Sequence, residues 1–87
     1  MLKEIRKNID DTDSKILELL IKRFAETDKI AKLKKTVYDE NREKEILDNL
    51  KSINKKRLDE DFLENIWIFI MKESKKRQRK IKDQGLR

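Results

Sequence analysis

Cysteine, histidine and proline are absent from this sequence of 87 residues, and glycine occurs once, at Gly85. Without cysteine or histidine, the chain can form no disulfide bond, no thiolate or imidazole metal site, no cysteine nucleophile and no Ser-His-Asp relay. The groups that remain for chemistry are carboxylates, amines, guanidiniums, hydroxyls and amides. We therefore expect a site that acts through charge and hydrogen bonds, with no metal and no cofactor.

The lack of helix-breaking residues favours an all-α fold. Charged residues make up 48% of the chain, and lysine, glutamate, leucine and isoleucine dominate it, as is typical of long helices. The competing interpretation, a disordered chain of high charge, conflicts with the regular apolar spacing described below. We expect one small soluble domain over residues 1–87, located in the cytoplasm, because no signal or transmembrane segment is evident.

The net charge of +6 comes from the C-terminal segment. Residues 1–71 carry 16 basic and 16 acidic residues, whereas residues 72–87 carry 8 basic and 2 acidic ones. A basic tail from about residue 75 is compatible with binding to nucleic acid or to an acidic membrane surface. A solvated helix end is the simpler interpretation.

Apolar residues that recur at steps of three, four and seven predict one amphipathic helix from about Lys3 to about Lys35. A helix of roughly 33 residues spans about 50 Å, whereas a compact chain of this length is about 30 Å across. The helix must therefore extend beyond its own domain, and a second copy of the chain is the simplest partner for the excess. The apolar stripe comprises Leu2, Ile5, Ile9, Ile16, Leu19, Leu20, Ile30 and Leu33.

Two further helices complete the prediction of three per chain. The second runs from Asn41 to about Ile53, with Asp39 just ahead of it as a capping residue. The third begins after Asp59 or Asp61, either of which can cap it. Its apolar stripe comprises Phe62, Leu63, Ile66, Phe69 and Ile70.

Some polar residues lie where the stripe of the first helix should continue. Arg23 occupies a position in the heptad series of Ile9, Ile16 and Ile30. Lys34 follows eleven residues later, about 20° round the helix, so both cations should point into one volume. Arg6 lies about 25 Å away along the axis. It could therefore reach that volume only from a partner subunit.

The other two helices show the same interruption. Ser74 and Gln78 continue the stripe of the third helix, Glu43 lies on the buried flank of the second, and Asp39 and Arg42 surround its start. Taken singly, such residues are more often caps, solvated surface residues or stems packed on apolar surface. Taken together, their clustered cations predict a pocket for a compact dianion.

Three groups of segments resemble the AroQ-type, all-helical chorismate mutases, and they follow the family's order over nearly the whole chain. The first group is similar to the family's first helix, the second to the entry of its second helix, and the third to the end of its third helix. In that order they are Ile5–Asp13, Leu19–Arg23 and Ile30–Lys34; Tyr38–Glu43; and Ile70–Ser74 followed by Gln78.

This resemblance implies an intertwined, domain-swapped helical homodimer in which the long first helices cross. Arg6 of the partner subunit and Arg23 would then bind the carboxylates of chorismate, with Arg42 and Ser74 helping at the rim. The absence of further domains implies a stand-alone mutase, able to dock on another enzyme of aromatic amino acid biosynthesis.

The reaction that the resemblance implies is a unimolecular [3,3] rearrangement of chorismate to prephenate, which needs neither a nucleophile nor a general acid or base. Lys34 and Gln78 would contact the ether oxygen of the breaking bond, and Asp39 and Glu43 the ring hydroxyl. The segment between Lys34 and Asp39 is shorter than in the family. For this reason the ether contact stays open between Lys34 and its neighbours, Lys35 and Lys32.

Two alternatives remain open. One is an isochorismate pyruvate lyase of the same fold, which binds a similar dianion, although Asp39, Arg42 and Glu43 together favour the mutase. The other is a non-enzymatic helical dimer that binds nucleic acid or a partner helix through its basic tail. That tail lacks interleaved aromatic residues and nucleic-acid-binding motifs. We therefore favour the enzyme over a nucleic-acid-binding dimer, and we expect no membrane partner.

Overall fold

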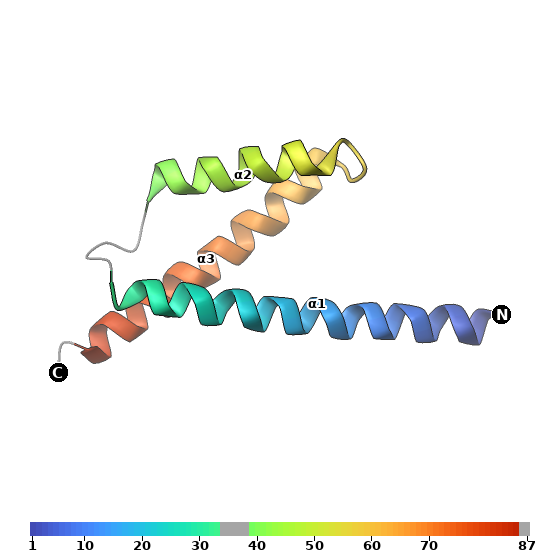
Figure 1. The fold of residues 1–87 in the computed structure, drawn as a ribbon, viewed down its shortest axis with the longest axis horizontal. Helices are drawn as coiled ribbons and strands as arrows, with labels where there is room; N and C mark the ends of the chain where they lie inside the picture. The colour runs from blue at the N-terminus through green and yellow to red at the C-terminus, as the bar shows by residue number, and fades with distance from the viewer. Residues whose placement is uncertain (34–38, 86–87) are drawn as a thin grey trace.

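The computed structural model describes residues 1–33 and 39–85. Over these ranges it contains α1 (Leu2–Ala31), α2 (Glu40–Asn54) and α3 (Glu60–Gly85), and no strand (Figure 1). The predicted all-α class with three helices is confirmed. The basic segment after residue 75 continues α3 as far as Gly85.

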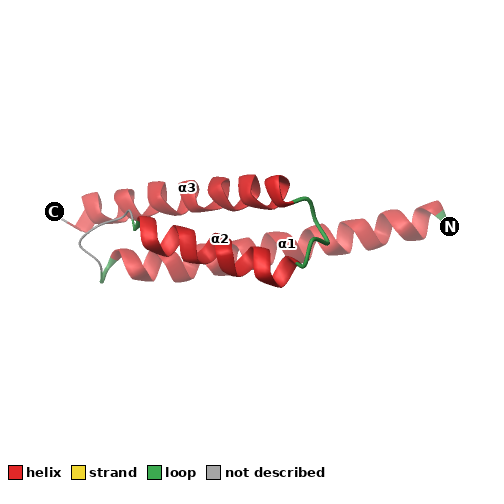
Figure 2. Ribbon diagram, turned by 90° about the horizontal axis from the view of Figure 1, so that it is seen from above, coloured by secondary structure: helices red, strands yellow, loops and turns green. Residues whose placement is uncertain are grey.

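The third helix holds the molecule together, because α3 packs against both α1 and α2 while the described parts of α1 and α2 do not pack on each other. In Figure 1, α3 runs diagonally from the end of α2 to the C-terminal end of α1. Figure 2 shows the N-terminal part of α1 extending beyond the ends of the other two helices. The chain is correspondingly long and thin, at 55 × 27 × 15 Å.

The first helix ends at Ala31, four residues before the predicted end near Lys35, so that prediction was wrong. The backbone tightens into a turn in which the N–H groups of Lys32 and Leu33 donate to the carbonyls of Lys29 and Ile30. Leu33, which was placed in the apolar stripe, is 85% exposed in this turn. Bonds of this i to i+3 type commonly end a helix without glycine or proline, and so leave no mark in the sequence.

Side-chain caps start the other two helices. Oδ1 of Asp39 accepts a hydrogen bond from the backbone N–H of Arg42 at 3.0 Å, and Oδ2 of Asp59 accepts one from that of Phe62 at 2.9 Å. Each bond satisfies a donor that the first helical turn leaves open, typically contributing about 1 kcal/mol. The predicted cap at Asp39 is confirmed, and of the two candidates for α3 it is Asp59 that caps.

A buried asparagine fixes the turn between α2 and α3. Asn54 is 7% exposed; its amide Nδ2 donates to the carbonyl of Leu58 at 2.9 Å, and its Oδ1 accepts from the N–H of Leu58 at 3.0 Å. Lys55 and Lys56 take the left-handed backbone conformation, with φ of 50° and 60°. This conformation costs free energy outside glycine. The two hydrogen bonds between Asn54 and Leu58 offset that cost and fix the direction in which the chain turns from α2 into α3.

Very little apolar surface is buried within one chain. Among the described residues, the buried apolar side chains are Ala31, Leu63 and Met71. Every residue from 1 to 19 is exposed, and the radius of gyration is 16.1 Å, against about 12 Å for a compact chain of this length. The predicted extension of the first helix beyond its own domain is therefore observed. In the described part of the chain, no helix is long and apolar enough to span a membrane.

Candidate active site

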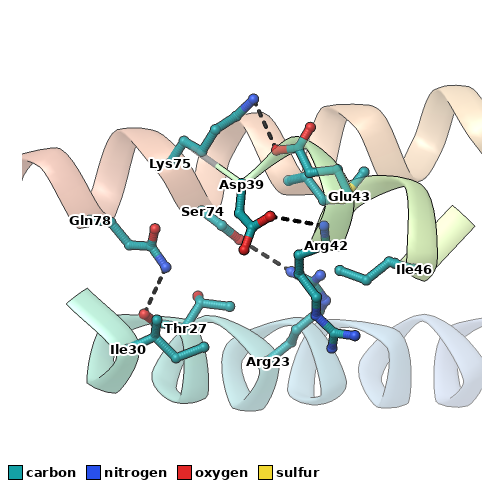
Figure 3. A pocket seen from close by; sticks show the side chains of 11 residues that line it. Arg23, Thr27, Ile30, Asp39, Arg42, Glu43, Ile46, Ser74, Lys75 and Gln78 are labelled. Carbon is teal, nitrogen blue, oxygen red and sulfur yellow. Dashed lines mark hydrogen bonds and ion pairs between the residues drawn. The ribbon is translucent and has the colours of Figure 1, made fainter. Parts of the chain in front are cut away.

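A pocket lies where the C-terminal half of α1, the start of α2 and the C-terminal half of α3 face one another (Figure 3). Eight of its eleven lining residues are polar or charged, and the other three are apolar. From α1 these are Arg23, Thr27 and Ile30; from the start of α2, Asp39, Arg42, Glu43 and Ile46; and from α3, Met71, Ser74, Lys75 and Gln78.

The pocket brings together six of the residues singled out in the sequence: Arg23, Asp39, Arg42, Glu43, Ser74 and Gln78. Arg6 lies elsewhere, on a shallow hollow near the start of α1 that Leu2 and Asp10 also line.

The lysines proposed for the ether contact are not placed in this pocket. Lys34 and Lys35 lie outside the described residues, and Lys32 is exposed in the turn after α1. The helical-phase argument assumed one helix through Lys34, whereas α1 ends at Ala31; the placement of Lys34 in the site stays a prediction.

Arg23 joins α1 to α3 at the centre of the pocket. Its Nη1 donates to Oγ of Ser74 at 3.1 Å, and that hydroxyl donates in turn to the carbonyl of Ile70 at 3.2 Å. Burial lowers the pKa of Arg23, and the nearby charge of Arg42 lowers it further. Both causes disfavour the cation. Since an arginine stays protonated regardless, the site holds a positive charge that an anionic ligand would stabilise.

Gln78 lies in the wall between α1 and α3, where it is 8% exposed. Its Nε2 donates to the carbonyl of Thr27 at 2.9 Å. One residue earlier, the guanidinium of Arg77 makes two bonds to the carboxylate of Asp28, at 3.1 and 2.6 Å, and its Cζ lies 5.2 Å from the ring centre of Phe24. These contacts set the register of α3 on α1. They therefore fix where Gln78 enters the pocket.

The start of α2 supplies the carboxylates. Asp39 is engaged by the N-terminal turn of the helix, and Arg42 pairs with Glu45 on the exposed side. Glu43 turns toward α3, where its Oε2 lies 3.1 Å from Nζ of Lys75. Figure 3 shows this ion pair on the far side of the pocket from Arg23.

Lys75 is the charged pocket residue that sequence reasoning missed. It follows Ser74 directly and precedes Gln78 by three residues, so it borders the polar stripe of α3. That spacing was a usable signal. The strongly basic composition after residue 72 concealed it, because lysines in such a run are usually solvated.

The chain matches the family model of chorismate mutase type II over residues 5–79. It belongs to that family. Membership indicates an isomerase with chorismate mutase activity. No curated protein and no solved structure matches the chain.

The pocket suits the chemistry of a chorismate mutase. Chorismate carries two carboxylates, and the pocket offers the guanidinium of Arg23, with that of Arg42, paired with Glu45, at its edge. The hydroxyl of Ser74 could in principle act as a nucleophile, but its hydrogen bonds are to Arg23 and to a backbone carbonyl, and not to a base that could activate it. Within residues 1–33 and 39–85, no cluster of three acidic side chains could hold a metal ion. The arrangement is that of a binding site built from charge and hydrogen bonds.

Proposed function

We propose that this chain converts chorismate to prephenate by a unimolecular [3,3] rearrangement in the pocket around Arg23. One observation carries the proposal: Arg23, on α1, and Ser74, on α3, meet at 3.1 Å in a pocket that Asp39, Glu43 and Gln78 also line. All of these positions match the segments that resemble the family. They come from three different helices, so their convergence was not guaranteed by their places in the sequence.

The rearrangement needs a folded conformer of the substrate and stabilisation of the charge that develops as its carbon–oxygen bond lengthens. Arg23, supported by Ser74, would hold one carboxylate and so select the reactive conformer. Gln78 lines the same pocket and is nine-tenths buried. A fixed amide donor at this place can stabilise the negative charge on the ether oxygen. Asp39 and Glu43, on the opposite wall, would orient the ring through its hydroxyl.

We further propose that the active form is a homodimer in which each pocket receives Arg6 from the other subunit. The apolar stripe of α1 supports this. Ile5, Ile9, Ile16 and Leu19 are 50–64% exposed, and covering each would contribute on the order of 1 kcal/mol. Arg6 precedes Arg23 by seventeen residues, about 25 Å along the helix. One chain therefore cannot bring both arginines to one ligand, whereas two crossed copies of α1 can.

An apolar groove marks the face that a second copy would cover. It is formed by the middle of α1 and the first half of α3, and its wall is almost wholly apolar. Phe69, in this wall, is 75% exposed. A continuous apolar surface with exposed aromatic side chains is rarely left open to water. The groove is lined by Ile16, Leu19, Leu20, Phe62, Ile66, Trp67, Phe69 and Ile70, with Arg23 and Asn65 at its edge.

The test is to incubate the purified chain with chorismate and, separately, with isochorismate. We expect prephenate from the first and no salicylate or pyruvate from the second. Salicylate and pyruvate from isochorismate, without prephenate from chorismate, would instead make the chain a lyase of this fold. A chain inactive on both substrates would overturn the proposal.

The Arg23→Ala variant links this activity to the pocket. It should lower kcat/KM by about a thousandfold or more, since it removes a part-buried, charge-assisted contact to the reacting molecule. Arg79→Ala is the matched control, because Arg79 is an exposed arginine of α3 that lines no pocket described above. Equal rates for wild type and Arg23→Ala would remove the proposed site.

A further inference from the structure

The ion pair between Lys75 and Glu43 joins α3 to α2 at the edge of the pocket. Its nitrogen and oxygen lie 3.1 Å apart, and the two side chains are only 22% and 25% exposed. By comparison, the side chains of the Lys29–Glu26 pair on α1 are 69% and 63% exposed. Solvent and salt screen a shielded pair less than an open one. The Lys75–Glu43 contact should therefore hold its geometry, whereas the surface pair contributes little.

This pair has a consequence for Arg23. Besides Lys75, the pocket contains two guanidiniums and two carboxylates, so its arginines would be neutralised before any ligand arrives if the carboxylates turned toward them. In the described part of the chain, no carboxylate pairs with Arg23, whose hydrogen bond goes to Ser74. Asp39 is engaged at the start of α2. Glu43 is thus the pocket carboxylate whose rotation could bring it onto the arginines.

We infer that Lys75 is a positioning residue, which holds Glu43 against α3 and thereby leaves Arg23 open to a carboxylate of the substrate. Figure 3 shows the arrangement: the carboxylate of Glu43 points to Lys75, and Arg23 rises from α1 on the other side of the pocket. The same contact keeps Glu43 oriented for the ring hydroxyl. This inference rests on the proposed function, because it assigns a role within that site.

The variant Lys75→Met removes the ammonium group and keeps most of the apolar stem. Glu43 then loses its partner and can turn toward Arg23, where it competes with the substrate. We expect the KM for chorismate to rise roughly tenfold, with a smaller change in kcat, as when binding rather than the chemical step is weakened. Lys75→Arg should restore the wild-type KM because it restores the ion pair.

Lys76→Met is the matched control. Lys76 is the next residue of α3, it is exposed, and it does not line this pocket. Its KM and kcat should equal those of the wild type. Circular dichroism of every variant checks folding. If Lys75→Met does not fold, Lys75→Gln carries the same comparison.

Combining Lys75→Met with Glu43→Gln separates positioning from other roles. Once Glu43 has lost its charge, removal of Lys75 has no carboxylate left to release, so the double variant should have the KM of Glu43→Gln alone. A tenfold rise in both backgrounds would mean that Lys75 acts on the substrate or the fold directly, and would overturn the inference. An unchanged KM in Lys75→Met would also overturn it, with the proposed function intact. A wild-type chain that forms no prephenate would remove both.

Discussion

The two halves of α1 carry one continuous apolar stripe but lie in different surroundings. From Leu20 to Ala31 the helix packs on α3, and it contributes Arg23 and Thr27 to the pocket. From residue 1 to residue 19 every position is exposed. Because only one half of the apolar stripe packs within the chain, the other half is available to pack against another molecule. In our proposal, that is the same stripe of a second chain.

The largest effect should come from breaking the exposed half of the stripe. The double variant Ile9→Glu, Ile16→Glu places two charges where the partner helix would pack, and burying an unpaired charge is strongly unfavourable. We expect loss of the dimer and of nearly all activity, measured by analytical ultracentrifugation and the chorismate assay. The control is Asp11→Lys, about 200° round the helix from Ile9. An active monomer would contradict the proposed assembly.

A second experiment tests which half of α1 serves which pocket. Arg6→Ala and Arg23→Ala should each be nearly inactive as pure dimers. Mixing them by unfolding and refolding together should restore roughly a quarter of the wild-type rate. The reason is that half of the dimers are mixed, and one of the two sites in each of these has both arginines. Mixtures that stay inactive would show that Arg6 is not donated across the dimer.

The smallest effect is expected at a cap far from both features. Asp59→Ala removes the side-chain bond that starts α3, which should lower stability by about 1 kcal/mol and the melting temperature by roughly 4–8 °C. Differential scanning calorimetry measures the shift. The KM for chorismate should not change, because Asp59 does not line the pocket. A changed KM would mean that the start of α3 also shapes the site.

Local rules accounted for most of the fold and for the polar residues of the pocket. The apolar period located the three helices, and the preference of aspartate for helix starts located the cap at Asp39. The interrupted stripes identified Arg23, Ser74 and Gln78 as residues facing inward, and they do line one pocket. Such features depend only on neighbours within a few turns, which is why a single sequence reveals them.

The end of the first helix and the features that depend on contacts between helices were not predictable in the same way. The end of α1 at Ala31 has no glycine or proline to mark it. The pairing of Lys75 with Glu43 depends on how closely α2 approaches α3, and the bond of Gln78 to the carbonyl of Thr27 depends on the register of α3 on α1. The roles of Arg6 and Lys34 remain predictions.

The lack of direct packing between α1 and α2 has a consequence for what a bound guest would do. Arg23 belongs to α1 and Asp39 to the start of α2. Because the described parts of these two helices do not pack on each other, a ligand bound by both residues would add a direct non-covalent contact between them. Occupancy should then slow hydrogen exchange at the start of α2 and raise the melting temperature as ligand concentration increases. Bound substrate would therefore complete the contacts that hold the walls of its own binding site together.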